Sequence, residues 1–335
     1  MARIGIVIPA FNSERFLSAT LKGVMDQTFT DWNCVVVDDG SVDQTAEIVA
    51  QVCREDPRFK LVRQDNSGIA RARNRGYQEI DSNADYVIFL DHDDIWEAEA
   101  LHTLFTVLDA HPNAVGAHGL ARYIDQDGVP ISPETIMQAH RSKSALSVAP
   151  PDLEDWQRNR MKYADGDIVP APLDQPTDFS HLIHECRTVT PGTVLIRRSA
   201  LRESYPFDPA LVPLDAWDLW IRISRFGDIL FVNQRVLNYR FHAGNASKSY
   251  QGRMDGILNA LYRKTFLSSE NSDEHRQILA QWRQRHMRIQ LRGFAGGFVR
   301  GVVSLLKGDI NKARFRLRLS RRYLSEYSYW VSHKK

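Results

Sequence analysis

The stretch Tyr86-Val-Ile-Phe-Leu-Asp-His-Asp-Asp-Ile-Trp96 joins five apolar or aromatic residues directly to three aspartates within four positions. A short apolar run allows either a strand or a helix, but this one is β-branched and aromatic, which favours a strand. A continuous apolar strand is typical of a sheet that helices cover on both faces. The stretch therefore predicts a central, buried strand that ends in an acidic turn.

The three aspartates of this turn predict either a cation site or a helix cap. In an extended chain the side chains of Asp91 and Asp93 point to the same side, about 7 Å apart, so both can face one cation. Carboxylate oxygens suit Mg²⁺ or Mn²⁺, which bind phosphates through one or two protein carboxylates. The alternative is an acidic turn that caps a helix starting near Glu97.

Apolar strands alternate with amphipathic helices before this stretch, with strands expected at 4–8, 34–38 and 61–63. Such alternation predicts a parallel, right-handed α/β sheet. Ligands of these sheets bind beyond the carboxyl ends of the strands. The sequence has no GxGxxG and no GxxxxGK[ST] motif, so a nucleotide bound at this edge would need a metal ion for its phosphates.

Composition limits the remaining possibilities. The chain has 335 residues, of which 43% are hydrophobic, enough for one large domain or two. No run of 18 apolar residues predicts a membrane-spanning helix. The N-terminal apolar run is short and ends at Pro9, so we expect no signal peptide and a cytoplasmic location. The three cysteines are widely separated and indicate neither a metal site nor a disulfide framework.

Charge is unevenly distributed along the chain. Residues 276–335 hold 15 Lys or Arg and two acidic residues, a balance of +13, whereas residues 1–275 balance at −11. Residues 293–324 mix bulky apolar residues with cations, which suits the anionic surface of a membrane. The alternative is a basic helical region packed on the acidic remainder. We expect no nucleic-acid partner, because the basic region lacks a recognition motif and such a function would leave the other 275 residues unexplained.

Four ordered blocks resemble those of family 2 glycosyltransferases with the GT-A fold. They are Ile6-Val-Ile-Pro-Ala-Phe-Asn12, Val35-Val-Val-Asp-Asp-Gly-Ser41, Asn66-Ser-Gly-Ile-Ala-Arg-Ala-Arg-Asn74 and Phe89-Leu-Asp-His-Asp-Asp94. Later segments, Trp217-Asp-Leu-Trp-Ile-Arg222, Tyr239-Arg-Phe-His242 and Asn245-Ala-Ser247, are similar to the end of the family's catalytic domain.

The resemblance covers residues 3–250 and implies a domain organisation. We expect a GT-A domain over residues 1–250, an α/β fold with a mostly parallel sheet flanked by helices. Residues 122–191 hold eight of the 14 prolines and would form an insertion on the acceptor side. Residues 251–335 would form a basic, helical C-terminal extension.

The resemblance also implies how a nucleotide sugar is bound. Asp39 would hydrogen-bond the base, usually uracil, and Asp91 would lie toward the ribose. The same nucleotide site would include Pro9, Ala10, Asn12, Asn66 and Gly68.

Other residues would act on the diphosphate. Asp93 would hold a divalent cation, Mn²⁺ or Mg²⁺, that bridges the two phosphates, and Asp91 is a second candidate ligand. Arg71 and Arg73 would add positive charge near the diphosphate, or would be solvated helix arginines. His242 would approach the metal or the diphosphate, or would be merely packed and hydrogen-bonded.

Inverting transfer needs a general base for the acceptor hydroxyl. Members of the family place an acidic pair just before the Trp-Asp-Leu-Trp block, but here Ala216 stands where the second carboxylate is expected. Asp215 is therefore the first candidate for the base and Asp218 the second. The alternative for Asp215 is a cap on the following helix.

Together these features predict an inverting, metal-dependent glycosyltransferase. It would move a sugar from a nucleotide diphosphate, UDP first, to a hydroxyl of a saccharide or lipid-linked saccharide in surface polysaccharide or glycan synthesis. A peripheral position on the inner face of the membrane would suit a lipid-linked acceptor. The alternative is a catalytically impaired nucleotide-sugar-binding protein, because Ala216 removes an expected carboxylate.

Overall fold

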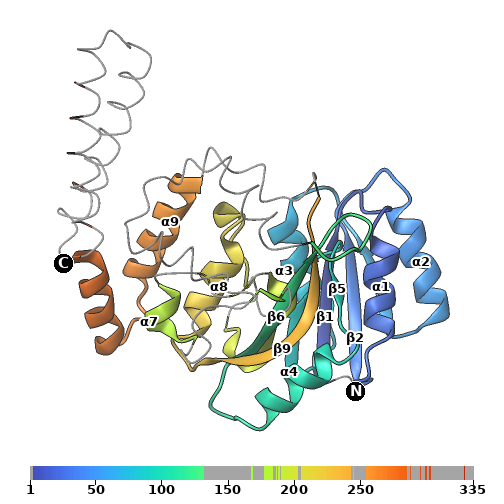
Figure 1. The fold of residues 1–335 in the computed structure, drawn as a ribbon, viewed down its shortest axis with the longest axis horizontal. Helices are drawn as coiled ribbons and strands as arrows, with labels where there is room; N and C mark the ends of the chain where they lie inside the picture. The colour runs from blue at the N-terminus through green and yellow to red at the C-terminus, as the bar shows by residue number, and fades with distance from the viewer. Residues whose placement is uncertain are drawn as a thin grey trace. The chain divides into compact units, whose positions relative to one another are not determined.

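The computed structural model describes residues 3–131, 167–168, 177–183, 186, 188, 190–202, 205–242, 244 and 254–284, together with residues 287, 295, 299, 302 and 328. Figure 1 shows the fold. The elements in chain order are β1 (Ile4–Ala10), α1 (Leu17–Met25), β2 (Trp32–Asp38), α2 (Thr45–Glu55), β3 (Phe59–Arg63), α3 (Ile69–Glu79), β4 (Tyr86–Phe89), β5 (Ile95–Trp96), α4 (Ala100–Asp109), β6 (Gly116–Ile124), β7 (Asp167–Ile168), α7 (Phe179–Leu182), η1 (Pro191–Thr193), β8 (Val194–Arg197), η2 (Arg198–Ala200), η3 (Pro209–Leu211), α8 (Asp215–Ile223), β9 (Ile229–Arg240) and α9 (Met254–Leu267).

The described strands form one sheet in the order β3-β2-β1-β4-β8-β6-β9-β5, with β7 paired to β6. The strands β3, β2, β1 and β4 are parallel, and Ile4 of β1 lies between Trp32 of β2 and Tyr86 of β4. Beyond them, β8 runs antiparallel to both β4 and β6, and β5 runs antiparallel to β9. The predicted α/β fold with a central strand at Tyr86 is confirmed.

Alternate residues of β1 pack against helices on opposite faces of the sheet. Ile6 and Ile8 belong to a buried cluster that includes Leu21 of α1 and apolar residues of α2 and α4. On the other face α3 lies so close that a Cβ added to Gly76 would be 2.3 Å from Cγ1 of Val7. Figure 1 shows α1 and α2 on one side of β1 and α3 on the other. Because helices cover both faces of the sheet, the sequences of its central strands are nearly continuous apolar runs.

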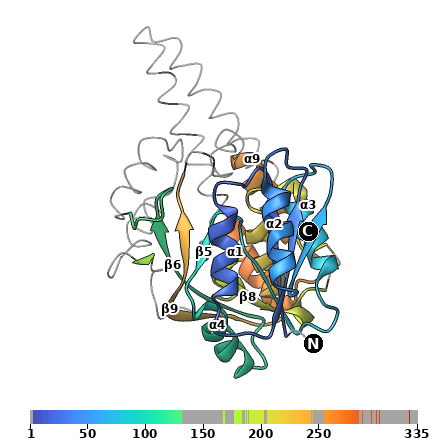
Figure 2. The ribbon, with the colours of Figure 1, turned by 90° about the vertical axis from the view of Figure 1, so that its right-hand side faces the viewer.

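The loops that follow β1, β2, β3 and β4 lie at one edge of the sheet, because these four strands are parallel. These loops contain residues 11–16, 39–44, 64–68 and 90–94. Figure 2 shows α1 and α2, the two helices into which the first two loops lead, side by side on the sheet. Polar residues that the sequence scatters over more than 80 positions are therefore gathered at one edge.

The first of two compact units ends at Glu270 and includes α9. Nζ of Lys264 in α9 lies 2.8 Å from Oδ2 of Asp208 and 3.0 Å from Oδ2 of Asp218, which fixes α9 against α8. In the second unit residues 273–284 are helical. Most of the predicted insertion (122–191) and of the predicted membrane-binding segment (293–324) lies outside the described residues.

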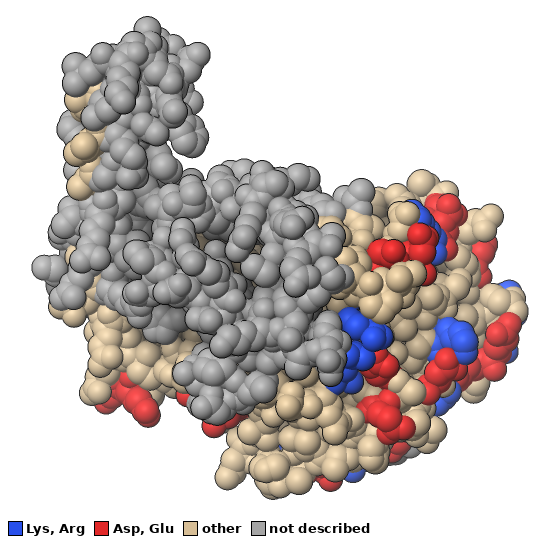
Figure 3. Space-filling model, in the orientation of Figure 1, with Lys and Arg blue, Asp and Glu red and all other residues tan. Residues whose placement is uncertain are grey.

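Two surface properties bear on possible partners. On the face shown in Figure 3, acidic and basic side chains are interspersed over the part of the surface where α1 and α2 lie, so that region presents no field of a single sign. No helix in the described part of the chain is both long enough and apolar enough to cross a bilayer.

Candidate active site

The loops after β1 and β2 are tied together by hydrogen bonds. The backbone N–H of Asn12 donates to Oγ of Ser41 at 2.9 Å, and the N–H of Val42 donates to Oδ1 of Asn12 at 3.1 Å. The N–H of Ser13 donates to Oγ1 of Thr45 at 2.7 Å. Asn12 has a φ of 47°, a left-handed conformation that asparagine tolerates better than most residues. Its carboxamide thus holds together two loops beside the predicted nucleotide pocket.

Asp39 is 3% exposed, and its carboxylate is held by the loop after β3. The N–H of Gly68 donates to Oδ2 at 2.8 Å, and the N–H of Ser67 donates to Oδ1 at 2.9 Å. Nε2 of Gln64 donates to Oδ1 at 2.7 Å. The predicted pair Asp39 and Gly68 is therefore brought together. Gln64, which sequence reasoning missed, joins them and carries no distinguishing sequence signal.

The remaining residues predicted to bind the nucleotide lie in these loops or next to them. Pro9 and Ala10 end β1, and the carbonyl of Ala10 accepts a hydrogen bond from the N–H of Asp39 at 2.8 Å. Gly40 has a φ of 77°, and a Cβ added to it would lie 2.8 Å from the backbone nitrogen of Asn66. Only glycine allows the two loops to approach this closely.

Arg73 of α3 links two of the predicted aspartates. Its side chain is 5% exposed; Nη2 lies 2.7 Å from Oδ1 of Asp91, and Nη1 lies 2.9 Å from Oδ2 of Asp215. Thr190, which sequence reasoning missed, donates from Oγ1 to the other oxygen of Asp91 at 3.1 Å. Arg73 is therefore not a solvated helix arginine.

Asp215 is the first residue of α8 and does not cap it, which corrects one of the alternatives. Burial raises the pKa of Asp215; the positive charge of Arg73 opposes this shift and the negative charge of Asp91 adds to it. A carboxylate with a raised pKa holds a proton more readily, which suits a general base.

A second contact from α3 fixes the segment before α8. Nδ2 of Asn74 donates to the carbonyl of Phe207 at 2.7 Å, and the N–H of Phe207 donates to Oδ1 of Asn74 at 2.8 Å. Both bonds are buried, and the ring of Phe207 packs edge-on against Phe89 of β4 with centroids 4.6 Å apart. This clamp, formed by Asn74 and Phe207, places α8 and with it Asp215 relative to the sheet.

Asp93 and His242 meet at the same edge. Nε2 of His242 lies 2.8 Å from Oδ2 of Asp93, and both side chains are 13% exposed. Burial alone would raise the pKa of Asp93, but the hydrogen bond with His242 and the nearby His92 lower it below its ordinary value. The ring of His242 also packs against Phe16, with centroids 4.7 Å apart and the ring planes tilted by 47°. The pair therefore offers an ionised carboxylate beside an imidazole.

A divalent cation fits the donor atoms of this pair. Octahedral Mg²⁺ holds adjacent ligand atoms about 3 Å apart, close to the 2.8 Å between Asp93 and His242. The N–H of Gly244 donates to Nδ1 of His242 at 3.2 Å, which leaves Nε2 as the nitrogen that faces Asp93. For Nε2 to hold a cation, the proton of the neutral ring would have to lie on Nδ1. Among the described residues, no group of three or more His, Cys, Asp or Glu side chains is placed to hold a metal ion.

Asp94 supports the acidic turn from inside the protein. The N–H of Arg240 donates to Oδ1 of Asp94 at 3.0 Å, and Nε of Arg240 donates to the carbonyl of Asp93 at 3.0 Å. Burial, followed by the charges of Asp93 and Asp91, raises the pKa of Asp94 well above its ordinary value. Asp94 therefore has a structural role: it is buried behind the turn and bonded to the backbone of β9. Arg240 was missed as a site residue, although it lies in the block that ends at His242.

Two predicted residues lie outside this cluster. Asp218 is buried, and its Oδ2 is 2.9 Å from Nε of Arg222 and 3.0 Å from Nζ of Lys264. Arg71 is exposed, and its Nη1 donates to the carbonyl of Ser67 at 3.2 Å. Both cations that contact Asp218 belong to the packing of α8 and α9.

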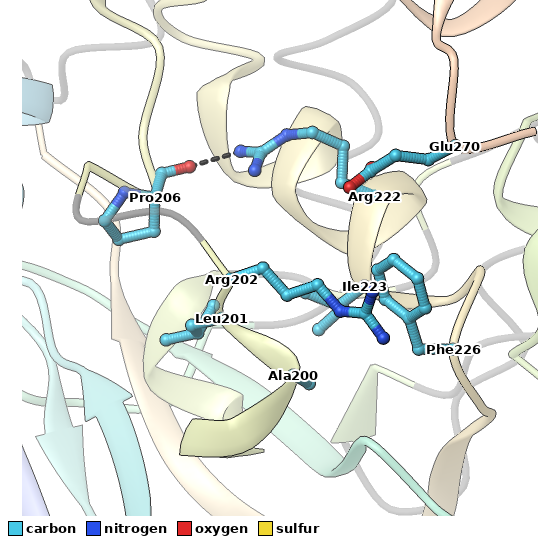
Figure 4. A pocket seen from close by; sticks show the side chains of 8 residues that line it. All are labelled: Ala200, Leu201, Arg202, Pro206, Arg222, Ile223, Phe226 and Glu270. Carbon is cyan, nitrogen blue, oxygen red and sulfur yellow. Dashed lines mark hydrogen bonds between the residues drawn. The ribbon is translucent and has the colours of Figure 1, made fainter.

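A small pocket adjoins Arg222 (Figure 4). Arg222 donates to the carbonyl of Pro206, and the guanidinium of Arg202 lies 3.6 Å from the centre of the Phe226 ring. The pocket is lined by Ala200, Leu201, Arg202, Pro206, Arg222, Ile223, Phe226 and Glu270. Since none of the predicted site residues lines it, the pocket is separate from the candidate active site.

The family model described as "Glycosyl transferase family 2" matches residues 5–204, more than half of the chain. The chain belongs to glycosyltransferase family 2. The predicted family is thereby confirmed, and the matched segment includes Asp39, Arg73, Asp91 and Asp93. The family 2 chain is 31% identical over 129 residues to the putative teichuronic acid biosynthesis glycosyltransferase TuaG of Bacillus subtilis. That match covers 38% of this chain and 50% of TuaG, so it spans about half of the relative's length.

Two solved structures share the fold of the family 2 chain. The crystal structure of S. aureus TarS 1–349 in complex with UDP-GlcNAc superimposes with a TM-score of 0.58 at 18% identity, covering 96% of this chain and 92% of that one. The mannosyltransferase PcManGT from Pyrobaculum calidifontis, in complex with GDP-Man and Mn²⁺, gives a TM-score of 0.56 at 15% identity, covering 99% and 88%. The predicted GT-A fold is confirmed.

Proposed function

We propose that the chain transfers a sugar from a nucleoside diphosphate to a hydroxyl group of a saccharide, with inversion at the anomeric carbon. The observation that carries the proposal is that the buried Arg73 joins Asp91, in the acidic turn, to Asp215, the candidate base. Membership of glycosyltransferase family 2 supports the class of reaction.

The donor is proposed to be a UDP-sugar first and a GDP-sugar second. The Asp39 carboxylate already accepts N–H donors from Ser67 and Gly68, and a ring N–H of uracil or guanine is a donor of the same kind. Cytosine has an acceptor at the corresponding ring position and would be repelled. The TarS and PcManGT structures were solved with one ligand of each kind, UDP-GlcNAc and GDP-Man.

In the proposed reaction Asp215 accepts the proton of the acceptor hydroxyl as the hydroxyl oxygen attacks the anomeric carbon. The new bond forms on the side opposite the bond to the diphosphate oxygen, which breaks and releases the nucleoside diphosphate. An α-linked donor therefore gives a β-linked product. Asp91, held by Arg73 and Thr190, would hydrogen-bond the ribose.

Asp93 and His242 are proposed to hold a divalent cation, Mn²⁺ or Mg²⁺. Such a cation would stabilise the negative charge of the leaving diphosphate. Their donor set fits this role because a carboxylate oxygen and an imidazole nitrogen can both bind such a cation. Asp218 is proposed to stabilise the packing of α8 and α9 through Arg222 and Lys264.

The acceptor is proposed to be a growing saccharide, including a lipid-linked one, in polysaccharide synthesis. The name of TuaG places that relative in teichuronic acid biosynthesis. The mixture of cations and bulky apolar residues in 293–324 supports contact with an anionic membrane surface from the cytoplasmic side.

A second candidate function is nucleotide-sugar binding without turnover. It is favoured by Ala216, which replaces an expected carboxylate, and by the 3% exposure of the Asp215 side chain. A base this buried needs the acceptor to displace surrounding groups before it can receive a proton.

Release of free nucleotide from a panel of nucleotide sugars tests the proposal. The purified protein is assayed with Mn²⁺, Mg²⁺ or EDTA, beside Asp93→Ala and a control, Asp26→Ala, which removes a 52% exposed carboxylate. We expect metal-dependent release from one donor that Asp93→Ala abolishes and Asp26→Ala retains. Calorimetric binding of a donor without its cleavage would favour the binding function, whereas neither binding nor cleavage would contradict both.

A further inference from the structure

Arg73 is a buried cation shared by two carboxylates from distant parts of the chain. It donates from Nη2 to Asp91, which follows β4, and from Nη1 to Asp215, which begins α8. Within the described residues its Nε has no hydrogen-bond partner, and the ring of Phe207 lies 5.2 Å from its Cζ. The two carboxylates are therefore the main compensation for a charge that burial disfavours.

The guanidinium of Arg73 fixes direction as well as charge. Its planar fork of donors fixes the relative position and orientation of the two carboxylates that it binds, whereas the ammonium of lysine is a point charge on a flexible stem. Asp91 is held from a second side by Thr190. The donor-side aspartate and the proposed base are thus linked through one rigid group.

The same cation separates two like charges. Burial raises the pKa of Asp215, Arg73 lowers it and Asp91 raises it. Without the guanidinium, the buried Asp215 carboxylate would face Asp91 with no cation between them. Arg73 thereby favours the deprotonated form that a base needs at the start of each cycle.

We propose that Arg73 is a positioning residue that aligns Asp215 with the donor-side Asp91 and does not itself contact the donor diphosphate. This inference rests on the proposed function and names the residue through which the two halves of the site are joined. The 5% exposure of the Arg73 side chain supports it. Of the two arginines predicted to act on the diphosphate, Arg71 is the exposed one and is open to a ligand.

A double-mutant cycle in the full chain tests the first half of the proposal. Arg73→Met, Asp215→Asn and the double variant are compared by kcat for donor cleavage, with Arg75→Met as the control because Arg75 is 50% exposed on the same helix. We expect Arg73→Met to lower kcat by about 100-fold alone but by less than about threefold in the Asp215→Asn background. An equal loss in both backgrounds, or no loss in either, would overturn the proposal.

Arg73→Lys replaces Arg73→Met in the cycle if the methionine variant does not fold, as judged by circular dichroism. Lysine keeps the charge but cannot hold both carboxylates at once, so we expect kcat about tenfold below that of the unaltered protein. A kcat equal to that of the unaltered protein in Arg73→Lys would overturn the proposal.

Calorimetry with UDP tests the second half without requiring turnover. We expect the Kd for UDP to change by less than about fivefold in Arg73→Met and to increase by more than about tenfold in Arg71→Met. A larger increase in Arg73→Met than in Arg71→Met would show direct contact with the diphosphate and overturn the proposal. If the unaltered protein binds UDP but cleaves no donor, the proposed function fails, while this comparison still decides the role of Arg73.

Discussion

The clamp between Asn74 and Phe207 should contribute strongly to stability. Asn74→Ala removes two buried hydrogen bonds, of 2.7 and 2.8 Å, and leaves the N–H and the carbonyl of Phe207 without partners. An unsatisfied buried polar group costs about 1–3 kcal/mol. With two such groups, the free energy of unfolding should decrease by about 2–6 kcal/mol, and kcat should also fall because the clamp positions α8.

Urea unfolding followed by tryptophan fluorescence measures this change, since the chain has seven tryptophans. The control is Asn83→Ala, which removes an exposed side chain whose Nδ2 donates to Asp81 at 3.2 Å. We expect the control to change the free energy of unfolding by less than about 0.5 kcal/mol. Equal stabilities for Asn74→Ala and Asn83→Ala would refute the reasoning that the clamp holds α3 to the segment before α8.

Three further predictions follow from the packing, the electrostatics and the nucleotide loop. Gly76→Ala should lower the free energy of unfolding by about 1–3 kcal/mol, because the added Cβ would lie 2.3 Å from Val7. In the same urea titration Gly256→Ala should raise the free energy of unfolding by about 0.5–1 kcal/mol, because the space around its Cβ is open. Burial raises the pKa of Asp215, although Arg73 opposes this shift. Because only the ionised base accepts a proton, kcat/KM should increase with pH through a pKa above the ordinary aspartate value of about 3.9. A pH profile unchanged by Asp215→Asn would contradict this assignment. Asp39→Asn turns an amide donor toward the N–H groups of the loop after β3. It should weaken UDP binding at least about tenfold by calorimetry. Unchanged affinity would mean that Asp39 does not reach the uracil base.

Local sequence patterns predicted the sheet and the loops that carry the site. The apolar run from Tyr86 indicated a central strand because both of its faces are buried, and parallel topology gathers the polar residues at the carboxyl ends of β1, β2 and β4. Asp39 and Gly68 were correctly placed in neighbouring loops for the same reason.

Long-range pairing could not be predicted in this way. Arg73 and Asp215 are 142 positions apart, and Asn74 and Phe207 are 133 apart, so no periodicity relates them. Arg71 and Arg73 look equivalent in the sequence, yet one is exposed and the other buried, because only Arg73 points toward α8 and the acidic turn. The position of Asp215 just before the expected helix suggested a helix cap, but the helix begins at Asp215 itself and the carboxylate binds Arg73 instead.

The anomeric configuration of the sugar released from the donor tests the central claim most directly. Water replaces the acceptor in the cleavage reaction, and proton NMR at early time points distinguishes the two anomers before they equilibrate. The account predicts that an α-linked donor first releases the β-anomer, at a rate that Asp215→Asn reduces by about 100-fold or more. Initial release of the α-anomer would contradict a single displacement assisted by Asp215.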